Sequence, residues 1–325
     1  MKFEHTYDLL GVKIHLATNS EGIQEKARLF LGAHEVSREK TPDFHLTFTE
    51  ADTLPDYQVA ELKACRPQDY LVVERDSRVF FSVGEGVACY DIQARTCQAH
   101  VLKHAGDPQP ALGSVPLVNL AVVWTMFTAG FLPLHAAAVL QGDRLIVLAG
   151  EKGAGKSTLA LKLHQQGFPL ICDDLVYLKR RDNRLVAGGH CQPLKLKSAE
   201  GDIWLKGCPE AGGGARIPGK KLFPIEHFNA RGKNQLHHVE AIFFLEPSPA
   251  PDQPASVCSH RDVEVVYHLL GDAPMLNTPG YRARTLDLMY GAGECGYYLA
   301  QTSLNVDNTV KEILYALGQI SKLAA

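Results

Sequence analysis

The chain has 325 residues, 46% of them hydrophobic and 21% charged, and a formal net charge of −3. These values are ordinary for a globular protein and exclude a disordered or fibrous chain. The length allows two domains, each with a sizeable core. The small net charge and the lack of a dense Lys/Arg run argue against a nucleic-acid partner.

The cysteines and the N-terminus predict a cytoplasmic protein. Eight cysteines are scattered along the chain without a C-x-x-C pair. This pattern argues against a disulfide framework and against a zinc site, and it suits a reducing compartment. Residues 1–11 carry charges throughout and lack the apolar core of a signal peptide.

Residues 1–110 predict a smaller α+β accessory domain with a mixed or antiparallel sheet. Its sequence contains no catalytic constellation, so packing, dimerisation or substrate docking is its expected role. Alternating and apolar runs predict strands, and apolar residues at helical spacing predict one helix. The predicted strands cover residues 12–16, 44–48, 70–73, 78–83, 87–92 and 96–102, and the helix covers residues 21–31.

Residues 104–110 have the composition of a linker, and residues 111–325 form the second predicted domain. Residues 117–140 are long enough to span a bilayer and carry no formal charge. However, Asn119, Pro133 and His135 interrupt this segment. We predict a buried helix over residues 118–128 and a buried strand over residues 134–140 instead of a membrane span.

A phosphate-binding loop follows. Residues 145–148 predict a buried strand, residues 150–157 match the pattern Gly-x-x-x-x-Gly-Lys-Ser, and residues 157–166 predict a helix. Polyphosphate must lie against backbone N–H groups, which requires glycines where a Cβ would obstruct it or where φ is positive. The helix N-terminus adds free N–H donors and a positive dipole.

The loop sequence assigns individual roles to its residues. Lys156 offers a positive charge to the outer phosphates, and the Ser157 hydroxyl suits a magnesium ion that bridges them. The predicted nucleotide-binding residues are Gly150, Glu151, Lys152, Gly153, Ala154, Gly155, Lys156, Ser157 and Thr158.

Two carboxylates follow the next apolar run. Residues 170–172 predict a strand that ends in Asp173 and Asp174. After a strand–loop–helix unit, we expect this strand to lie parallel to the first, with its carboxyl end beside the phosphates. One carboxylate would then hold magnesium, for which we assign Asp173, and the other would accept a proton from an attacking hydroxyl. The alternative is a turn that merely caps the next element.

His135 lies fifteen residues before Gly150, in the sequence LPLHAAAV. Residues 134–176 thereby resemble the HPr kinase/phosphorylase family, in which a His, a P-loop and an Asp pair recur in this order and at these spacings. The resemblance implies that His135 assists acid–base chemistry and that Lys156 and Ser157 hold phosphate and metal. It further implies that Asp174, with Asp173 beside it, accepts a proton from a serine hydroxyl.

The chain departs from this family at two places. Thr158 stands where the family carries Glu, and residues 193–197 read PLKLK where the family carries a signature similar to LLEIRG, whose Glu takes part in metal binding. Glu200 is nearby. These departures favour the HPr-kinase-related proteins that phosphorylate a seryl peptide or protein, without the reverse phosphorylase reaction.

Farther along, residues 176–178 and 185–187 predict a strand pair, residues 239–245 a strand and residues 309–323 an amphipathic helix. Residues 207–221 predict a mobile loop that could bring basic side chains to phosphate, or that is simply solvated. The basic residues of interest are Arg216, Lys220 and Lys221 in that loop, and Arg282 and Arg284 beyond it.

The sequence thus predicts an α/β protein with a P-loop domain similar to HPr kinase, which uses ATP and Mg²⁺. The predicted reaction is transfer of phosphate to a serine or threonine hydroxyl of a peptide or protein. A homo-oligomer is compatible with this prediction. Two alternatives stay open, namely a kinase for a small hydroxylated molecule and a nucleotide-sensing regulatory module without catalysis.

Overall fold

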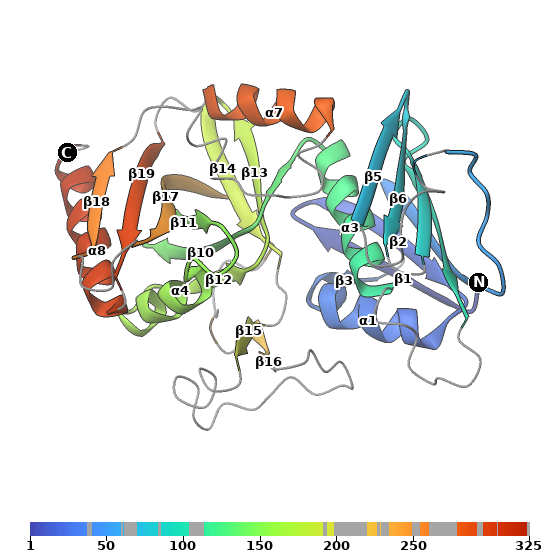
Figure 1. The fold of residues 1–325 in the computed structure, drawn as a ribbon, viewed down its shortest axis with the longest axis horizontal. Helices are drawn as coiled ribbons and strands as arrows, with labels where there is room; N and C mark the ends of the chain where they lie inside the picture. The colour runs from blue at the N-terminus through green and yellow to red at the C-terminus, as the bar shows by residue number, and fades with distance from the viewer. Residues whose placement is uncertain are drawn as a thin grey trace. The chain divides into compact units, whose positions relative to one another are not determined.

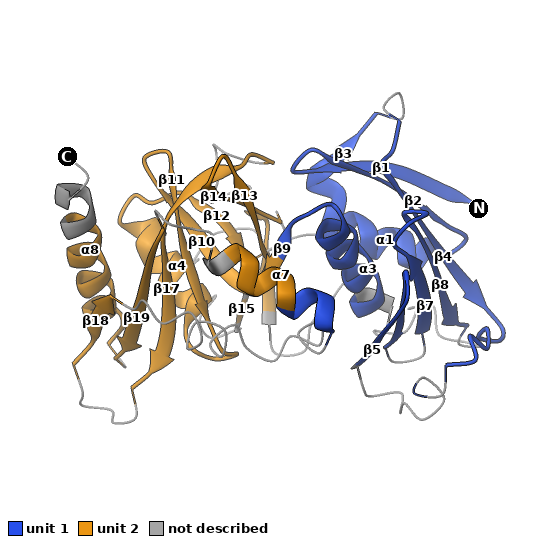
Figure 2. Ribbon diagram, turned by 90° about the horizontal axis from the view of Figure 1, so that it is seen from above, with its two compact units in different colours: residues 1–132, 274–282 blue, residues 133–273, 283–325 orange. Residues whose placement is uncertain are grey.

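The structure is a computed structural model, and its fold is mixed α/β with two large sheets. It describes residues 1–37, 41–59, 61, 70–83, 86–103, 114–190, 194–197, 220–225, 228, 234–248, 254–259, 278–290, 295–303 and 305–323. The chain divides into two compact units, Met1–Leu132 with Pro274–Arg282, and Pro133–Ala273 with Ala283–Ala325 (Figure 2). The domain division at residue 110 stays a prediction.

The first unit contains an eight-stranded sheet. Its strands, in spatial order, are β3 (Glu35–Val36), β1 (Phe3–Leu9), β2 (Val12–Thr18), β4 (Phe44–Ala51), β8 (Thr96–Leu102), β7 (Gly86–Asp91), β6 (Arg78–Val83) and β5 (Tyr70–Arg75). β4 runs parallel to both β2 and β8, while the other neighbours are antiparallel. The sheet is therefore mixed, as the alternating sequence pattern allows.

Two helices cover one face of this sheet, α1 (Glu21–Leu31) and α3 (Ser114–Thr128), as Figure 1 shows. α1 begins at Ser20, whose side chain accepts a hydrogen bond from the backbone N–H of Ile23. It is followed by the short 3-10 helix η1 (Gly32–His34). α3 buries Trp124, which packs edge-on against Phe127 with ring centroids 5.2 Å apart. The uncharged segment after the predicted linker therefore forms a core helix of the first unit.

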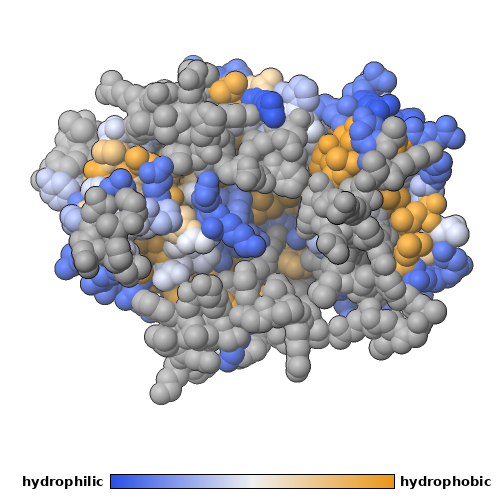
Figure 3. All heavy atoms as spheres, in the orientation of Figure 1, coloured by the Kyte–Doolittle hydropathy of each residue, from blue (hydrophilic) through white to orange (hydrophobic). Residues whose placement is uncertain are grey.

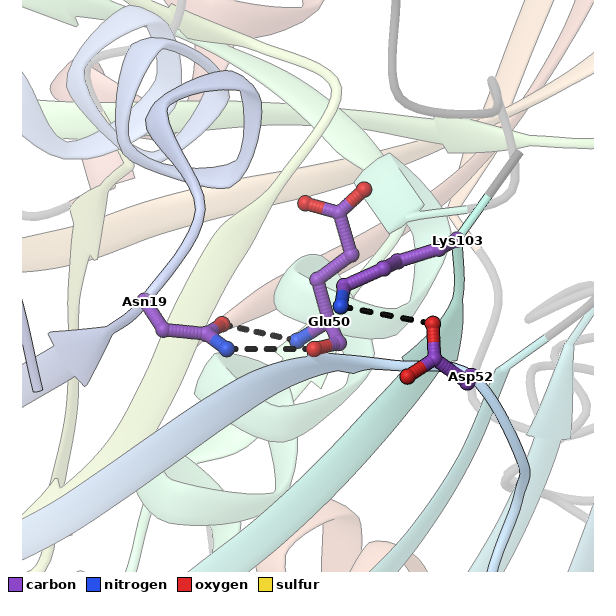
Figure 4. A network of polar contacts seen from close by, with 4 residues as sticks. All are labelled: Asn19, Glu50, Asp52 and Lys103. Atoms are coloured by element: carbon purple, nitrogen blue, oxygen red, sulfur yellow. Dashed lines mark hydrogen bonds and ion pairs between the residues drawn. The ribbon is translucent and has the colours of Figure 1, made fainter. Parts of the chain in front are cut away.

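A polar network joins the ends of three strands of the first unit (Figure 4). The side chain of Asn19 accepts a hydrogen bond from the backbone N–H of Glu50 at 2.8 Å and donates one to its carbonyl at 3.1 Å. Next to it, Lys103 Nζ lies 3.3 Å from a carboxylate oxygen of Asp52. Asn19 thus continues the pairing of β2 with β4 beyond the last residue of β2.

The second unit contains a nine-stranded sheet. Its main path is β12 (Leu170–Asp173), β10 (Ala136–Gln141), β11 (Arg144–Gly150), β17 (His237–Pro247), β14 (Arg184–Gly189), β13 (Val176–Arg181) and β9 (Leu132–Leu134). Off this path, β19 (Gly296–Thr302) pairs with β17 and with β18 (Ser256–Ser259). A separate two-stranded sheet consists of β15 (Leu194–Lys197) and β16 (Lys220–Phe223).

The strand directions agree with the expected crossover. β10 pairs antiparallel with β11 on one side and with β12 on the other. β11 and β12 are consequently parallel to each other, with β10 between them. β17 pairs parallel with β11, and β19 pairs parallel with β17. The prediction that the strand ending in the Asp pair runs parallel to the strand before the loop is confirmed.

Helices α4 (Lys156–Gln165) and α8 (Val306–Leu323) pack side by side on one face of this sheet (Figure 1). Lys162 of α4 and Asp307 of α8 form an ion pair at 2.9 Å. A further described helix, α7 (Pro279–Tyr290), contains residues of both units. The core beneath α4 and α8 is apolar. It includes Ala137, Val139, Ile146, Leu148, Leu159, Leu163, Phe243, Leu245, Val310 and Ile313.

The predicted strand over residues 134–140 is interrupted at its second residue. β9 ends at Leu134 and β10 begins at Ala136, so His135 lies at a break between two strands.

In the part of the chain that the structure describes, no helix has both the length and the hydropathy of a membrane span. The described cysteines, which are Cys89, Cys97, Cys172, Cys258 and Cys295, carry free thiols.

Over the part of the molecule that the structure describes, few large hydrophobic side chains are exposed. Figure 3 shows hydrophobic and hydrophilic residues interspersed over the described part of the face that it draws. Among the described residues, the large hydrophobic side chains that are exposed are Met1, at 57%, and Tyr315, at 68%.

Candidate active site

Three segments predicted to carry chemistry meet at one edge of the sheet of the second unit. The carboxyl ends of β11 and β12 lie at this edge, and so does the amino end of β10, because β10 runs in the opposite direction. The register pairs Ala136 with Ala149 and Ala137 with Asp173. His135 therefore lies next to the start of the loop and next to the Asp pair.

The loop between β11 and α4 depends on its glycines for two reasons. Gly150 has a φ of +143°, and a Cβ at this position would lie 2.6 Å from the carbonyl oxygen of Leu245 on β17. A larger residue is therefore excluded by both conformation and space. Gly153 and Gly155 have a φ of +92° and open space around the Cβ position, so only their backbone conformation requires glycine.

The N-terminus of α4 has no side-chain cap. Its N-cap is Gly155, and the first helical hydrogen bond runs from the N–H of Leu159 to the Gly155 carbonyl at 2.9 Å. The N–H groups of Lys156, Ser157 and Thr158 make no hydrogen bond to any residue that the structure describes. Unsatisfied N–H groups at a helix N-terminus bind anions, since the helix dipole favours negative charge there. The loop residues thus fit a polyphosphate ligand.

Lys156 is buried beside this loop, with 7% of its surface exposed. Its Nζ donates hydrogen bonds to the carbonyl oxygens of Gly150 at 2.8 Å and Glu151 at 3.0 Å. An ammonium group has three N–H bonds, and the described residues accept two of them, which leaves one for a ligand. Burial lowers the pKa of Lys156, while the charges of Asp174 and Asp173 act in the opposite direction. The positive charge of Lys156 is therefore stabilised by electrostatic attraction to both carboxylates.

Asp174 combines an unusual backbone with a close partner. Its φ is +124°, a region that residues other than glycine rarely occupy and that clusters at functional sites. One of its carboxylate oxygens lies 3.2 Å from Nε2 of His135, and the side chains of His135 and Asp174 are 47% and 37% exposed. The pair is therefore both in contact and accessible to a second reactant.

Asp173 lies in a different environment from its neighbour, since only 4% of its surface is exposed. Carboxylate and hydroxyl oxygens are the ligands that Mg²⁺ prefers, and it usually binds one or two of them together with phosphate oxygens and water. Asp173 and the partly buried Ser157 are oxygen donors of this kind. Within the described ranges, no three His, Cys, Asp or Glu side chains are placed to hold a metal ion by themselves.

The other residues for which a contact with phosphate or metal was predicted belong to other segments of the chain. Glu200 and Arg216 lie outside the described residues, and Lys220 and Lys221 are in strand β16. Arg282 and Arg284 are on α7, where burial lowers the pKa of Arg284. Their proposed contact with phosphate stays a prediction.

Sequence reasoning did not identify Gly189, the last residue of β14, which lies close to Cys172 of β12. A Cβ at Gly189 would lie 2.5 Å from Cβ of Cys172. The signal in the sequence is a glycine at the end of a predicted strand, which often marks a close approach of two backbones.

Comparison with known proteins gives little further support. No protein-family model matches the chain, and no curated protein matches it. A solved structure that is similar is the HPr(Ser) kinase/phosphatase from Coxiella burnetii, at 14% sequence identity and a TM-score of 0.33. The similarity covers 59% of this chain and 94% of that chain. A TM-score this low does not establish a shared fold.

Proposed function

We propose that the protein transfers the terminal phosphoryl group of ATP, with Mg²⁺, to a serine or threonine hydroxyl of a peptide or protein. One observation carries the proposal. The accessible contact between His135 and Asp174, at 3.2 Å, lies at the same sheet edge as a phosphate-binding loop whose helix N-terminus is uncapped. A proton acceptor beside a phosphate site is what phosphoryl transfer to a hydroxyl requires.

The triphosphate would be held by the loop from Gly150 to Thr158. Backbone N–H groups at the start of α4 would donate to phosphate oxygens, and the remaining N–H of Lys156 would neutralise charge on the transferred group. Ser157 and Asp173 would hold Mg²⁺, which supplies charge neutralisation between the outer phosphates.

Asp174 would act as the general base. Its carboxylate would accept the proton of the acceptor hydroxyl while the hydroxyl oxygen forms a bond to the terminal phosphorus and the bond from that phosphorus to ADP breaks. His135 would orient the carboxylate through Nε2 and stabilise its charge. The partial exposure of Asp174 supports an acceptor that approaches from solvent, such as a side chain of another polypeptide.

Asp174→Asn tests this assignment, because it keeps the size of the side chain and removes the proton acceptor. Single-turnover transfer from labelled ATP to a peptide substrate, or to water where no substrate is identified, should slow by about 10²–10⁴-fold. Affinity for ATP should hold or rise, because a carboxylate near the triphosphate is repulsive where magnesium does not screen it. Asp143→Asn is the matched control, since Asp143 is exposed at the opposite edge of the same sheet.

The outcomes separate the proposed kinase from its alternatives. Equal rates in wild type, Asp174→Asn and Asp143→Asn would remove the kinase assignment and leave a nucleotide-sensing module. Mass spectrometry of candidate peptides incubated with the protein and ATP identifies the acceptor. If phosphate is found only on a small hydroxylated molecule, that molecule is the acceptor in place of a peptide, and the proposed reaction is otherwise unchanged. His135→Ala should lower turnover and leave ATP affinity unchanged.

A further inference from the structure

Asp174 must be held in its unusual conformation by its surroundings, because a φ of +124° is unfavourable for an aspartate. The first restraint comes from β10. The backbone N–H of Asp174 donates a hydrogen bond to the carbonyl of Ala136 at 3.1 Å, directly after His135. This bond ties the base to the strand that begins next to its partner, but it leaves the following peptide unit to be fixed by other residues.

The second restraint comes from the hairpin of β13 and β14. Val176 pairs with Gly189 at the end of this hairpin, and the next residue, His190, donates its backbone N–H to the carbonyl of Leu175 at 3.0 Å. Leu175 is the residue between Asp174 and β13. His190 itself is buried, and its ring lies 6.1 Å from that of Tyr177. The chain is therefore held at the N–H of Asp174 and at the carbonyl of the next residue, Leu175.

The third restraint is a close approach between β14 and β12. At Gly189, an added Cβ would lie 2.5 Å from Cβ of Cys172, 2.7 Å from its Sγ and 3.0 Å from a methyl of Ile171. Cys172 is fully buried and lies two residues before Asp174. Cβ atoms do not approach this closely, so any side chain at Gly189 must push β12 and β14 apart.

We propose that the contact between Gly189 and Cys172 positions Asp174 toward His135, so that β14 controls phosphoryl transfer without touching a reactant. This inference rests on the proposed function of Asp174. Gly189 and Cys172 are positioning residues in this scheme. A displacement of β12 away from β14 would pull on the Leu175 carbonyl and rotate the strained peptide of Asp174, while the loop after β11 stays in place.

Gly189→Ala is the first test. We expect the single-turnover rate to fall by about 10–100-fold, since small misplacements of a catalytic group have effects of this size. The dissociation constant of a non-hydrolysable ATP analogue should stay within about twofold, because the phosphate loop belongs to β11 and α4. Hydrogen exchange of the Asp174 and His190 amides in the nucleotide-free protein should accelerate, because both hydrogen bonds weaken.

A double-mutant design shows whether the effect passes through Cys172. Cys172→Gly removes both Cβ and Sγ, so adding Gly189→Ala to this variant should slow it by less than about threefold. Cys172→Ala keeps the Cβ that lies 2.5 Å from the new methyl, so adding Gly189→Ala to this variant should still slow it by about 10-fold or more. The matched pair differs by one carbon atom at the predicted point of contact.

If Gly189→Ala does not fold, a substitution at Cys172 tests the same contact. Cys172→Val replaces the thiol by a methyl group, adds a second methyl group at the same Cβ, and introduces a residue that strands favour. A lower rate with unchanged analogue affinity and faster exchange at Asp174 is expected from it as well.

The proposal is overturned if folded Gly189→Ala reacts at the wild-type rate. It is overturned as well if adding Gly189→Ala slows Cys172→Gly and Cys172→Ala by the same factor. It is also overturned if rate and analogue affinity fall together, since the defect would then be general. A failure of the proposed function looks different, because Asp174→Asn would then not change turnover at all. In that case the exchange rates of the Asp174 and His190 amides still report whether the contact holds the peptide.

Discussion

Two helices of this protein begin in opposite ways. α1 of the first unit starts at Ser20, whose side chain accepts a hydrogen bond from the N–H of Ile23, and Glu21 adds a negative charge to its first turn. α4 of the second unit starts at Gly155, which has no side chain, and its first turn contains no acidic residue. The Ser20 side chain satisfies one N–H group at the N-terminus of α1, whereas the first N–H groups of α4 have no partner among the described residues.

The difference shows how a candidate phosphate site is recognised from the missing side-chain cap of a helix. A capped helix stabilises its fold without any partner. An uncapped helix gives up roughly 1 kcal/mol of such stabilisation and keeps its N–H donors and positive dipole available for an anion. Substitutions at the two helices should therefore affect different quantities, namely ligand affinity at α4 and folding stability at α1.

The largest effect is expected from Lys156→Ala. The outer phosphates lose a cation in a partly buried loop, so affinity for a non-hydrolysable ATP analogue with Mg²⁺ should fall by about 100-fold, or about 2.7 kcal/mol. Calorimetric titration measures it. Lys162→Ala is the control on the same helix, since Lys162 pairs with Asp307 of α8 and should not alter affinity. Unchanged affinity in Lys156→Ala would mean that this loop does not bind polyphosphate.

Replacing one glycine of each unit by alanine should change folding stability by different amounts, with a loss at Gly150 and none at Gly32. Gly150→Ala meets the Leu245 carbonyl at 2.6 Å and requires a φ of +143°, so we expect a loss of about 2–4 kcal/mol. Gly32, which ends α1, has a φ of −56° and open space around its Cβ position. Gly32→Ala should be neutral or stabilise by up to about 1 kcal/mol in urea denaturation. Equal losses at both sites would contradict the close approach of the loop to β17.

Removing the cap of α1 should have a smaller effect. Ser20→Ala deletes the acceptor of the Ile23 N–H, at a hydrogen-bond distance of 3.5 Å. Because this bond is long, a loss of about 0.5–1 kcal/mol is expected, at the low end for N-cap residues. Urea denaturation measures the loss, and Ser20→Thr, which keeps a hydroxyl, should largely avoid it. A change in ATP affinity would show that the two helices are coupled, contrary to the comparison.

The smallest effect concerns pH. Burial lowers the pKa of Lys156 below its ordinary value of 10.5, so the unfolded chain binds this proton more tightly than the folded chain. Stability is therefore reduced by the buried charge at neutral pH, and this penalty disappears as the pH rises through the folded pKa toward 10.5. Without nucleotide, wild type should gain stability relative to Lys156→Met over that alkaline window. A constant difference between the two would show that burial does not disfavour the ammonium group.

The sequence predicted local features well, because their causes are local. The bounds of α1 match the predicted residues 21–31, since both the apolar spacing and Ser20 lie within one short segment. The strands before the loop and before the Asp pair followed from apolar runs bounded by glycine and aspartate. β1, Phe3–Leu9, was missed, because the polar His5 interrupts the alternation of apolar and polar residues in its sequence.

Long-range contacts could not be predicted from one sequence. Nothing near Gly189 in the chain indicates that it meets Cys172, which lies seventeen residues earlier and on another strand. The positive φ of Asp174 likewise lies beside long-range hydrogen bonds, which the Asp174 N–H donates to Ala136 of β10 and the Leu175 carbonyl accepts from His190 after β14. Motifs thus identify candidate reactive residues, whereas the contacts that orient them depend on the whole sheet.

β10 lies between β11 and β12 and keeps the ends of these two strands apart. Adjacent strands lie about 4.8 Å apart, so one inserted strand separates the end of β11 from the end of β12 by about 10 Å. In the proposed reaction, a terminal phosphoryl group and an acceptor oxygen would occupy this gap, between the loop that would hold the donor and the carboxylate that would take the proton. Direct pairing of β11 with β12 would halve the gap and leave less room for a second reactant. The width of one strand would therefore set the working distance of the proposed site.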